Sequence, residues 1–225
     1  MTNAINKPCA YYSKIHSNFL VHPRIDAWRS YEEFLIAYNQ KSPEIARTTD
    51  IAKRYILGDK LQDSEMPPAF YVSPHKRITK LPEAFYAGGY IVVQEKCAEV
   101  FRQFDPGENS LVPKKIFQND KTTSVEGQFY ILNLGTLKDT LIPAKSSSLI
   151  GPINHARGTM WRFPLKAADD QFVLSSKALE GPDMWNEKSM FEAIFFSERL
   201  WRALEQAKLT KPFMGFRCQI EGAQA

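Results

Sequence analysis

Residues 193–208 read AIFFSERLWRALEQAK, a short apolar run followed directly by a helical pattern. The four apolar residues at 193–196 fit a buried strand. Ser197 is a typical helix N-cap, because its hydroxyl accepts a hydrogen bond from a free backbone N–H of the first turn. Leu200, Trp201 and Leu204 then recur at the spacing of one helix face. The segment therefore predicts a strand that passes straight into a helix at 198–208.

A second segment with the same design lies earlier in the chain. Residues 91–104 read IVVQEKCAEVFRQF and align without a gap to residues 194–207, with three identical positions in fourteen. Lys96 and Arg199 also occupy equivalent places. Two explanations stay open, an internal duplication or the geometry shared by strands that open helices, and so few identities favour the second.

The rest of the chain predicts short strands with a few helices. Helices are expected at 30–40, 43–57 and 94–104, and strands at 69–72, 90–93, 111–117, 128–134, 138–142, 160–163, 171–174 and 213–220. These elements predict an α+β fold, with a mixed or antiparallel sheet, a few flanking helices and a helical N-terminal segment. The polar stretch 59–68 ends in two prolines and marks a boundary. We expect residues 1–64 to form a mostly helical segment packed on the core, and residues 65–225 to form the α+β domain.

Composition narrows the class of protein. The chain has 225 residues and a formal net charge of +4, and it is long enough to bury a core without a metal or disulfide. Its basic residues are scattered rather than gathered in a stripe, which argues against nucleic-acid binding. The N-terminus lacks the apolar run of a secretory signal, and nowhere do eighteen apolar residues run together. We therefore expect a cytoplasmic protein that does not bind membranes.

The three cysteines do not suggest a redox or zinc site. They form no CxxC motif, and their odd number is typical of a reducing compartment. Cys97 and Cys218 fall on apolar positions of predicted elements and are expected to be buried, whereas Cys9 lies in a polar stretch where exposure is expected.

The residues that usually carry catalysis are sparse. Of the four histidines, only His22 has a ligand-type neighbour at close spacing, Asp26, and Pro23 between them makes a shared helix face doubtful. A pair of Cys9 and His155 could in principle act as nucleophile and base, but an unrelated thiol and loop histidine are the simpler interpretation. The adjacent carboxylates at 169–170 favour a turn. We expect no cofactor, no metal and no catalytic residue.

Several strands in the C-terminal part occur in a familiar order. They are FYILN at 129–133 with a following strand to 141, MWRF at 160–163, IFFSE at 194–198, and Leu209-Thr210 leading to FMGF at 213–216. Upstream, residues 88–104 add a strand and helix. This order resembles the bacterial immunity-protein family of polymorphic toxin systems, a myxobacterial-type immunity domain formerly catalogued as a domain of unknown function. The resemblance covers roughly residues 80–220, and the first sixty residues have no recognised counterpart.

The resemblance implies a cytoplasmic antidote that binds and neutralises a cognate secreted toxin domain, such as a type VI secretion effector, by covering it. Such a protein needs a rigid surface and no catalytic residue. Two alternatives stay open: a hydrolase-like enzyme using His155 and Arg157, and an adaptor of a secretion apparatus. The residues expected to contact the partner lie in the 144–158 loop and in an exposed excursion at 180–189, and they are Lys145, His155, Arg157 and Trp185.

Overall fold

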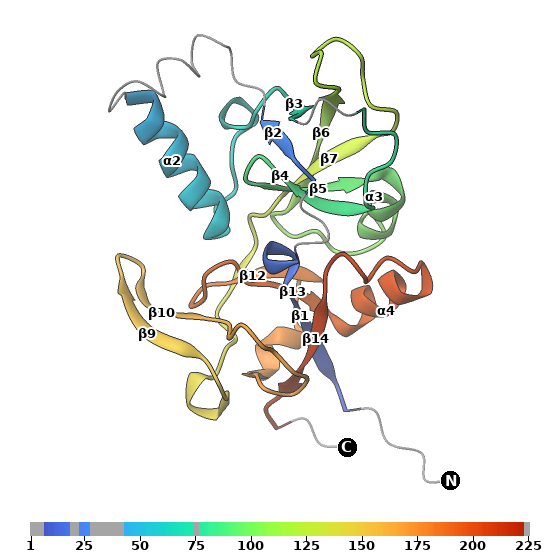
Figure 1. Cartoon of the computed structure of the whole chain (residues 1–225). Helices are drawn as coiled ribbons and strands as arrows, with labels where there is room; N and C mark the ends of the chain where they lie inside the picture. Colours follow the sequence, from blue (N-terminus) through green and yellow to red (C-terminus); the bar gives the residue numbers. More distant parts are fainter. Residues whose placement is uncertain (1–6, 19–22, 28–42, 74–76, 223–225) are drawn as a thin grey trace.

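The computed structural model describes residues 7–18, 23–27, 43–73 and 77–222. Within these ranges the chain forms fourteen strands and three α-helices. Twelve of the strands build two six-stranded sheets, and the other two form a separate hairpin. The predicted α+β class is therefore wrong, because the described part of the chain is mostly β. The two sheets lie one above the other in Figure 1, with the hairpin beside the lower one.

The upper sheet has the strand order β2-β3-β6-β7-β5-β4. Its strands are β2 (Ile25–Ala27), β3 (Ala69–Val72), β4 (Ala84–Ala87), β5 (Tyr90–Gln94), β6 (Ser110–Phe117) and β7 (Phe129–Asn133). Helices α2 (Pro43–Ile56) and α3 (Glu95–Phe101) lie beside this sheet (Figure 1). Helix α2 begins at a proline and is followed by Gly58 in the left-handed region (φ +80°), an arrangement typical of helix starts and ends.

The lower sheet has the order β11-β14-β1-β13-β12-β8. Its strands are β1 (Cys9–Ser13), β8 (Leu137–Lys138), β11 (Val173–Leu174), β12 (Met184–Glu187), β13 (Ile194–Ser197) and β14 (Gly215–Ile220). Helix α4 (Glu198–Gln206) follows β13 directly, and Ser197 Oγ accepts a hydrogen bond from Leu200 N at 3.2 Å. The predicted N-cap is confirmed. The hairpin consists of β9 (Ile150–His155) and β10 (Gly158–Arg162).

The prediction of a helical N-terminal segment is wrong for the described residues before α2, which form strands β1 and β2 and one short 3₁₀ turn (Ile15–Ser17). Strand β1 runs through the middle of the lower sheet, antiparallel to β13 on one side and to β14 on the other. Ala10 and Tyr12 are fully buried there, and Cys9 is buried as well, against expectation. A central strand is covered on both faces and needs no alternation of polar and apolar residues. The helix expected at 30–40 and His22 lie outside the described residues, and the division at residue 64 stays a prediction.

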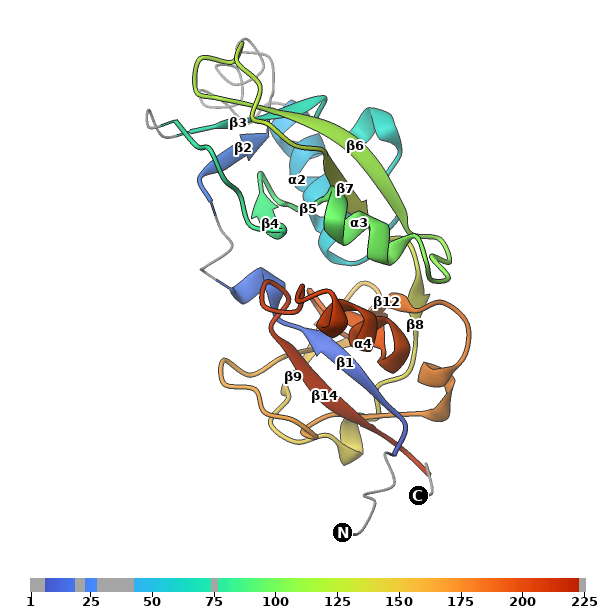
Figure 2. The same ribbon diagram turned by 90° about the vertical axis from the view of Figure 1, so that its right-hand side faces the viewer.

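The two sheets repeat one topology. In order and direction, β3-β6-β7-β5-β4 of the upper sheet matches β11-β14-β1-β13-β12 of the lower, including one parallel pair at the same place in each. The second set takes its central strand, β1, from the start of the chain. Helices α3 and α4 hold equivalent positions and face each other between the sheets in Figure 2. The likeness of residues 91–104 and 194–207 thus extends to five strands.

One apolar core joins the two sheets. Phe196 of β13 and Phe213 pack against Phe101 of α3, with ring centroids 6.3 and 6.0 Å from Phe101. These residues belong to a cluster that also contains the interior of the upper sheet. Because both sheets bury side chains in the same cluster, we expect them to unfold together.

Tyr55 of α2 provides a polar link inside this core. Its buried hydroxyl donates to Leu132 O at 2.8 Å and accepts from Ile91 N at 3.0 Å. Replacing Tyr55 with phenylalanine would leave both backbone groups without that partner, so we expect a loss of about 1–2 kcal/mol in the free energy of unfolding, measured by urea denaturation. Tyr130→Phe is the control, because its hydroxyl bonds to surface side chains that water can replace. Equal losses in the two variants would contradict the prediction.

Candidate functional site

The structure places the four residues predicted to contact a partner at three different positions. His155 and Arg157 come together at the tip of the β9–β10 hairpin, while Lys145 lies near its base in a 3₁₀ turn (Pro143–Lys145), paired with Glu221. The predicted 144–158 loop is therefore partly strand. Trp185 lies apart from these residues, in the interior of the lower sheet.

Trp185 is fully buried and offers no surface to a partner. It belongs to β12, whose four residues are all buried, so the excursion predicted as exposed at 180–189 is wrong over this strand. The indole stacks on Phe195 with ring centroids 5.6 Å apart, and Lys138 Nζ lies 4.1 Å from its centroid. The sequence around Trp185 is typical of a loop, yet Trp185 is part of the core.

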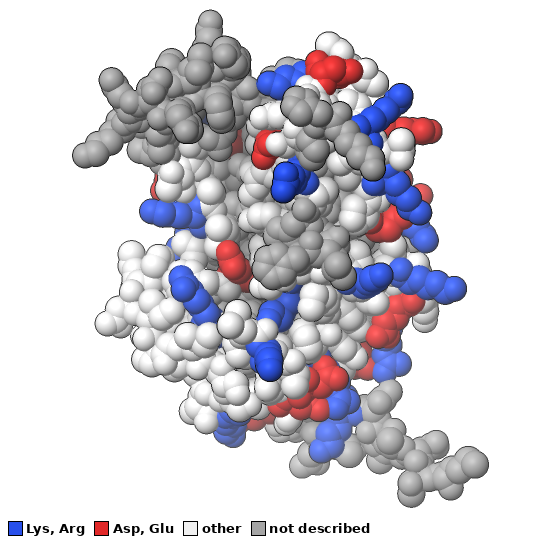
Figure 3. Space-filling model, viewed as in Figure 1, with Lys and Arg blue, Asp and Glu red and all other residues white. Residues whose placement is uncertain are grey.

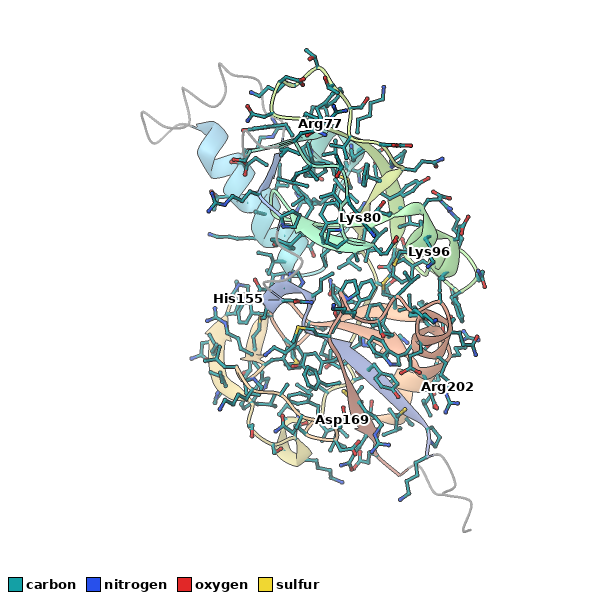
Figure 4. All side chains as sticks on the ribbon, turned by 45° about the vertical axis from the view of Figure 1, so that its right-hand side comes forward. Arg77, Lys80, Lys96, His155, Asp169 and Arg202 are labelled. Carbon is teal, nitrogen blue, oxygen red and sulfur yellow. The ribbon has the colours of Figure 1, made fainter. Side chains whose placement is uncertain are left out.

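The hairpin tip is fixed to the end of α2. Arg157 forms an ion pair with Asp59 and donates from Nη1 to Leu57 O at 3.3 Å. The backbone N–H of Arg157 also donates to His155 Nδ1 at 3.2 Å, and the His155 ring meets Phe191 edge-on. Figure 4 shows His155 on the side of the molecule where the hairpin meets α2. These contacts give the hairpin a defined position.

The base of the hairpin is held as well. Trp161 N donates to Ser189 O at 2.8 Å, and Phe191 N donates to Trp161 O at 3.0 Å. Strand β9 pairs only with β10 within the described residues, and four of its six residues are exposed. The hairpin is thus a preformed, largely exposed element attached at both ends.

A cavity of about 470 Å³ opens between this hairpin, the end of β1 and the end of α2. Lys14 and Arg162 bring positive charge to its lining, Glu192 brings the one carboxylate, and Phe163, Leu165 and Phe191 contribute apolar surface. We call this cavity the groove. Figure 3 shows more blue than red side chains over the middle of the face viewed in Figure 1.

Lys14 is held in the groove by backbone carbonyls. Its ammonium donates to Pro164 O at 3.1 Å and to Leu165 O at 2.6 Å. Desolvation by burial lowers the pKa of Lys14. Within the described residues no carboxylate lies within ion-pair distance of the Lys14 ammonium, so its hydrogen bonds go to carbonyl oxygens instead.

The catalytic alternatives that the sequence left open gain no support from the described residues. Neither His155 nor Arg157 lines the groove. Burial raises the pKa of the Cys9 thiol to about 11, so it is protonated at neutral pH and unsuited to act as a nucleophile. The carboxylates at 169–170 form the predicted turn, bound to Arg217. No group of three metal-ligating side chains comes together in the described part of the chain.

Glu187 is a buried carboxyl outside the groove. It accepts hydrogen bonds from Thr140 N, Thr140 Oγ1 and Ser189 Oγ, and burial raises its pKa above the ordinary value of 4.5 despite these donors. The folded state therefore binds its proton more tightly than the unfolded state does. Its contribution to stability is complete below the unfolded pKa and is lost as the pH rises through the folded pKa.

Glu187→Gln should remove this pH dependence. Because glutamine does not ionise, we expect the stability of the variant relative to the parent to rise as the pH increases from 4.5 through the raised pKa, and then to level off. Urea denaturation at a series of pH values measures this difference. A difference that is constant, or that falls with pH, would be the contrary result.

A charge pattern around the groove escaped the sequence analysis. The segment from residue 140 to residue 168 carries four basic residues, Lys145, Arg157, Arg162 and Lys166, and no acidic one. The chain has 29 basic and 25 acidic residues, so everything outside this segment is balanced at 25 of each. The whole net charge of +4 thus lies in the hairpin and its flanks. In the sequence, this concentration of charge is visible as a stretch without acidic residues rather than as a run of basic ones.

The described part of the chain is thus a mostly β protein with a hairpin beside a groove that is lined by cations. The sequence comparison names the family: residues 15–215 match the immunity protein family (Imm11). The chain therefore belongs to this family, as its strand order indicated, and the match also covers most of the first sixty residues. No curated protein matches the chain. None of the helices in the described ranges has the length and apolarity to cross a bilayer.

Proposed function

We propose that this protein is an antidote that binds a cognate toxin domain and neutralises it by covering its working surface, without catalysing a reaction itself. The observation that carries the proposal is membership of the immunity protein family across residues 15–215. The cognate toxin would be a secreted effector, and the encounter would take place in the cytoplasm.

The anchored hairpin supports this proposal physically. Covering a toxin requires roughly 800 Å² of surface on each partner, and a preformed surface lowers the entropy lost on binding. Contacts from Arg157 to Asp59 and Leu57 O and from Trp161 to Ser189 O hold the hairpin in place before any partner arrives. His155, Arg157 and Lys145 would contribute by shaping this surface.

Co-expression with the toxin domain encoded beside this gene tests the proposal. We expect cells to survive expression of the toxin only when this chain is present, and the purified pair to elute as one complex in gel filtration. No protection and no complex would refute the proposed function. Protection without a complex would point instead to an enzyme that reverses the damage.

A further inference from the structure

We infer that the groove and the acid-free segment 140–168 bind an acidic, extended segment of the toxin that carries an apolar side chain among its carboxylates. This inference rests on the proposed function and specifies the chemistry of the contact. It is drawn from three features of this face: the location of the net charge, the cations that remain unpaired, and the exposed apolar side chains.

The net charge is concentrated where the partner would bind. All four excess positive charges of the chain lie in residues 140–168, which form the hairpin and one wall of the groove. A cleft lined by charge of one sign attracts the opposite sign and speeds its association. The remainder of the protein has no net charge to compete for an acidic partner.

Two of these four cations are already paired, and two are available. Lys145 pairs with Glu221, and Arg157 with Asp59. Within the described residues, Arg162 and Lys166 have no carboxylate within ion-pair distance, and both are exposed. Lys14 adds a third cation, compensated only by two carbonyl oxygens. Glu192 is the one carboxylate in the lining of the groove.

Apolar side chains lie between these cations. Leu165 is 94% exposed, the highest value among the large apolar residues described. Phe163 lies beside it in the lining and stacks on Tyr12 at 3.6 Å between ring centroids. The Arg162 guanidinium lies 5.0 Å from the Phe191 ring centroid. An occupant that covers Leu165 would exclude water from the neighbouring cations, which strengthens their attraction to carboxylates.

This mixture favours a protein segment over a nucleic acid. Nucleic-acid binding relies on many phosphate contacts along an extended basic surface. Here two cations, Lys14 and Arg162, line a compact cavity, and Lys166 follows the exposed leucine of its lining in sequence. Strong, salt-sensitive binding of a single-stranded oligonucleotide that the toxin displaces would overturn the inference.

A double charge reversal, with a matched control, tests whether the cations of this face bind acidic residues of the toxin. The probe is a catalytically inactive form of the toxin domain encoded beside the gene, and the measurement is its Kd by calorimetry. We expect Arg162→Glu with Lys166→Glu to raise Kd about 30-fold, with weaker salt dependence. The control, Lys80→Glu with Lys96→Glu, makes the same change in net charge on the upper sheet's side, away from His155 (Figure 4), and should change Kd less than about threefold.

The outcomes separate the two proposals. If the parent protein binds the toxin and both double variants lose equal affinity, or neither does, the groove inference is wrong while the proposed function stands. If the parent protein does not bind the toxin at all, the proposed function fails. Urea denaturation of each variant verifies that the protein is folded.

Photo-crosslinking identifies the bound segment directly. Benzoylphenylalanine at Leu165 should crosslink to a toxin peptide with several acidic residues, identified by mass spectrometry. The same probe at Leu179, an apolar residue 50% exposed outside residues 140–168, should give little or no product. A crosslink from Leu165 to a basic or uncharged segment, or none at all in a formed complex, would overturn the inference.

Discussion

Replacing Trp185 with alanine should lower the free energy of unfolding by about 3–5 kcal/mol, the range found when a large buried aromatic side chain is removed. The side chain is fully buried, stacks on Phe195 and lies under the Lys138 ammonium. Its loss would leave a cavity between strands β12 and β13, which pair through these positions. The midpoint of a urea denaturation curve measures the change.

Trp185→Phe is the matched control. Phenylalanine keeps an aromatic ring against Phe195 and removes the indole N–H, which has no hydrogen-bond partner in the described structure. The smaller ring and the removal of an unsatisfied donor act in opposite directions, so we expect a change within about 1 kcal/mol of the parent. A small loss in Trp185→Ala, together with a large loss of toxin affinity, would restore the prediction that this residue contacts the partner.

Local patterns predicted the two strand-to-helix units well. The apolar run before Ser197 and the 3.6-residue spacing after it define β13 and α4 almost to the residue. Such units depend on neighbours in sequence, namely a cap and a helix face. The strands that were missed are β1, β2, β4, β9 and β12. Of these, β1 and β2 depend on partners far along the chain, whereas β4, β9 and β12 each pair with the next strand in sequence. Strand β1 pairs with residues near 195 and 218, and no local pattern in residues 9–13 indicates those partners.

The candidate site was predicted only in part from the sequence. Irregular sequence around residues 144–158 indicated an exposed element, and the structure has the β9–β10 hairpin there. The same reasoning failed at Trp185, because proline, glycine and acidic residues at 180–183 suggested a loop that continued through β12. The groove was not foreseen, since it joins Lys14, Ile56 and Arg162 from distant parts of the sequence.

Asp183→Ala should also destabilise the protein strongly, by about 3 kcal/mol, because this carboxylate connects the two sheets. The side chain is only 1% exposed. It accepts hydrogen bonds from Ser197 Oγ at 2.5 Å and from the Arg199 guanidinium at 2.5 and 2.7 Å. It also accepts from the backbone N–H of Asp105 at 3.1 Å, just beyond α3 of the upper sheet. Removing a buried charged acceptor leaves several donors unsatisfied at once.

Arg199→Ala tests how much of the stability comes from the ion pair of Asp183 with Arg199 and how much from the buried hydrogen bonds of Asp183. The Arg199 side chain is 67% exposed, so its removal exposes no cavity, and the carboxylate keeps the hydroxyl of Ser197 and the N–H of Asp105. We expect a loss of about 1 kcal/mol, well below that of Asp183→Ala. A double-mutant cycle by urea denaturation gives the coupling between the two residues. Equal losses in the two single variants would show that the exposed ion pair, rather than the buried hydrogen bonds, stabilises this junction.

The Ser197 hydroxyl explains why the junction should be sensitive. It donates to Asp183 Oδ1 and accepts from Leu200 N, so one side chain both caps α4 and binds the carboxylate that reaches the loop after α3. Without Asp183 the hydroxyl can still cap the helix, but the link to the upper sheet is lost. We therefore expect Asp183→Ala to shift the whole unfolding transition while leaving it a single transition, since the apolar core continues to join the two sheets. Two separate transitions would show instead that this carboxylate, rather than the shared core, makes the sheets unfold together.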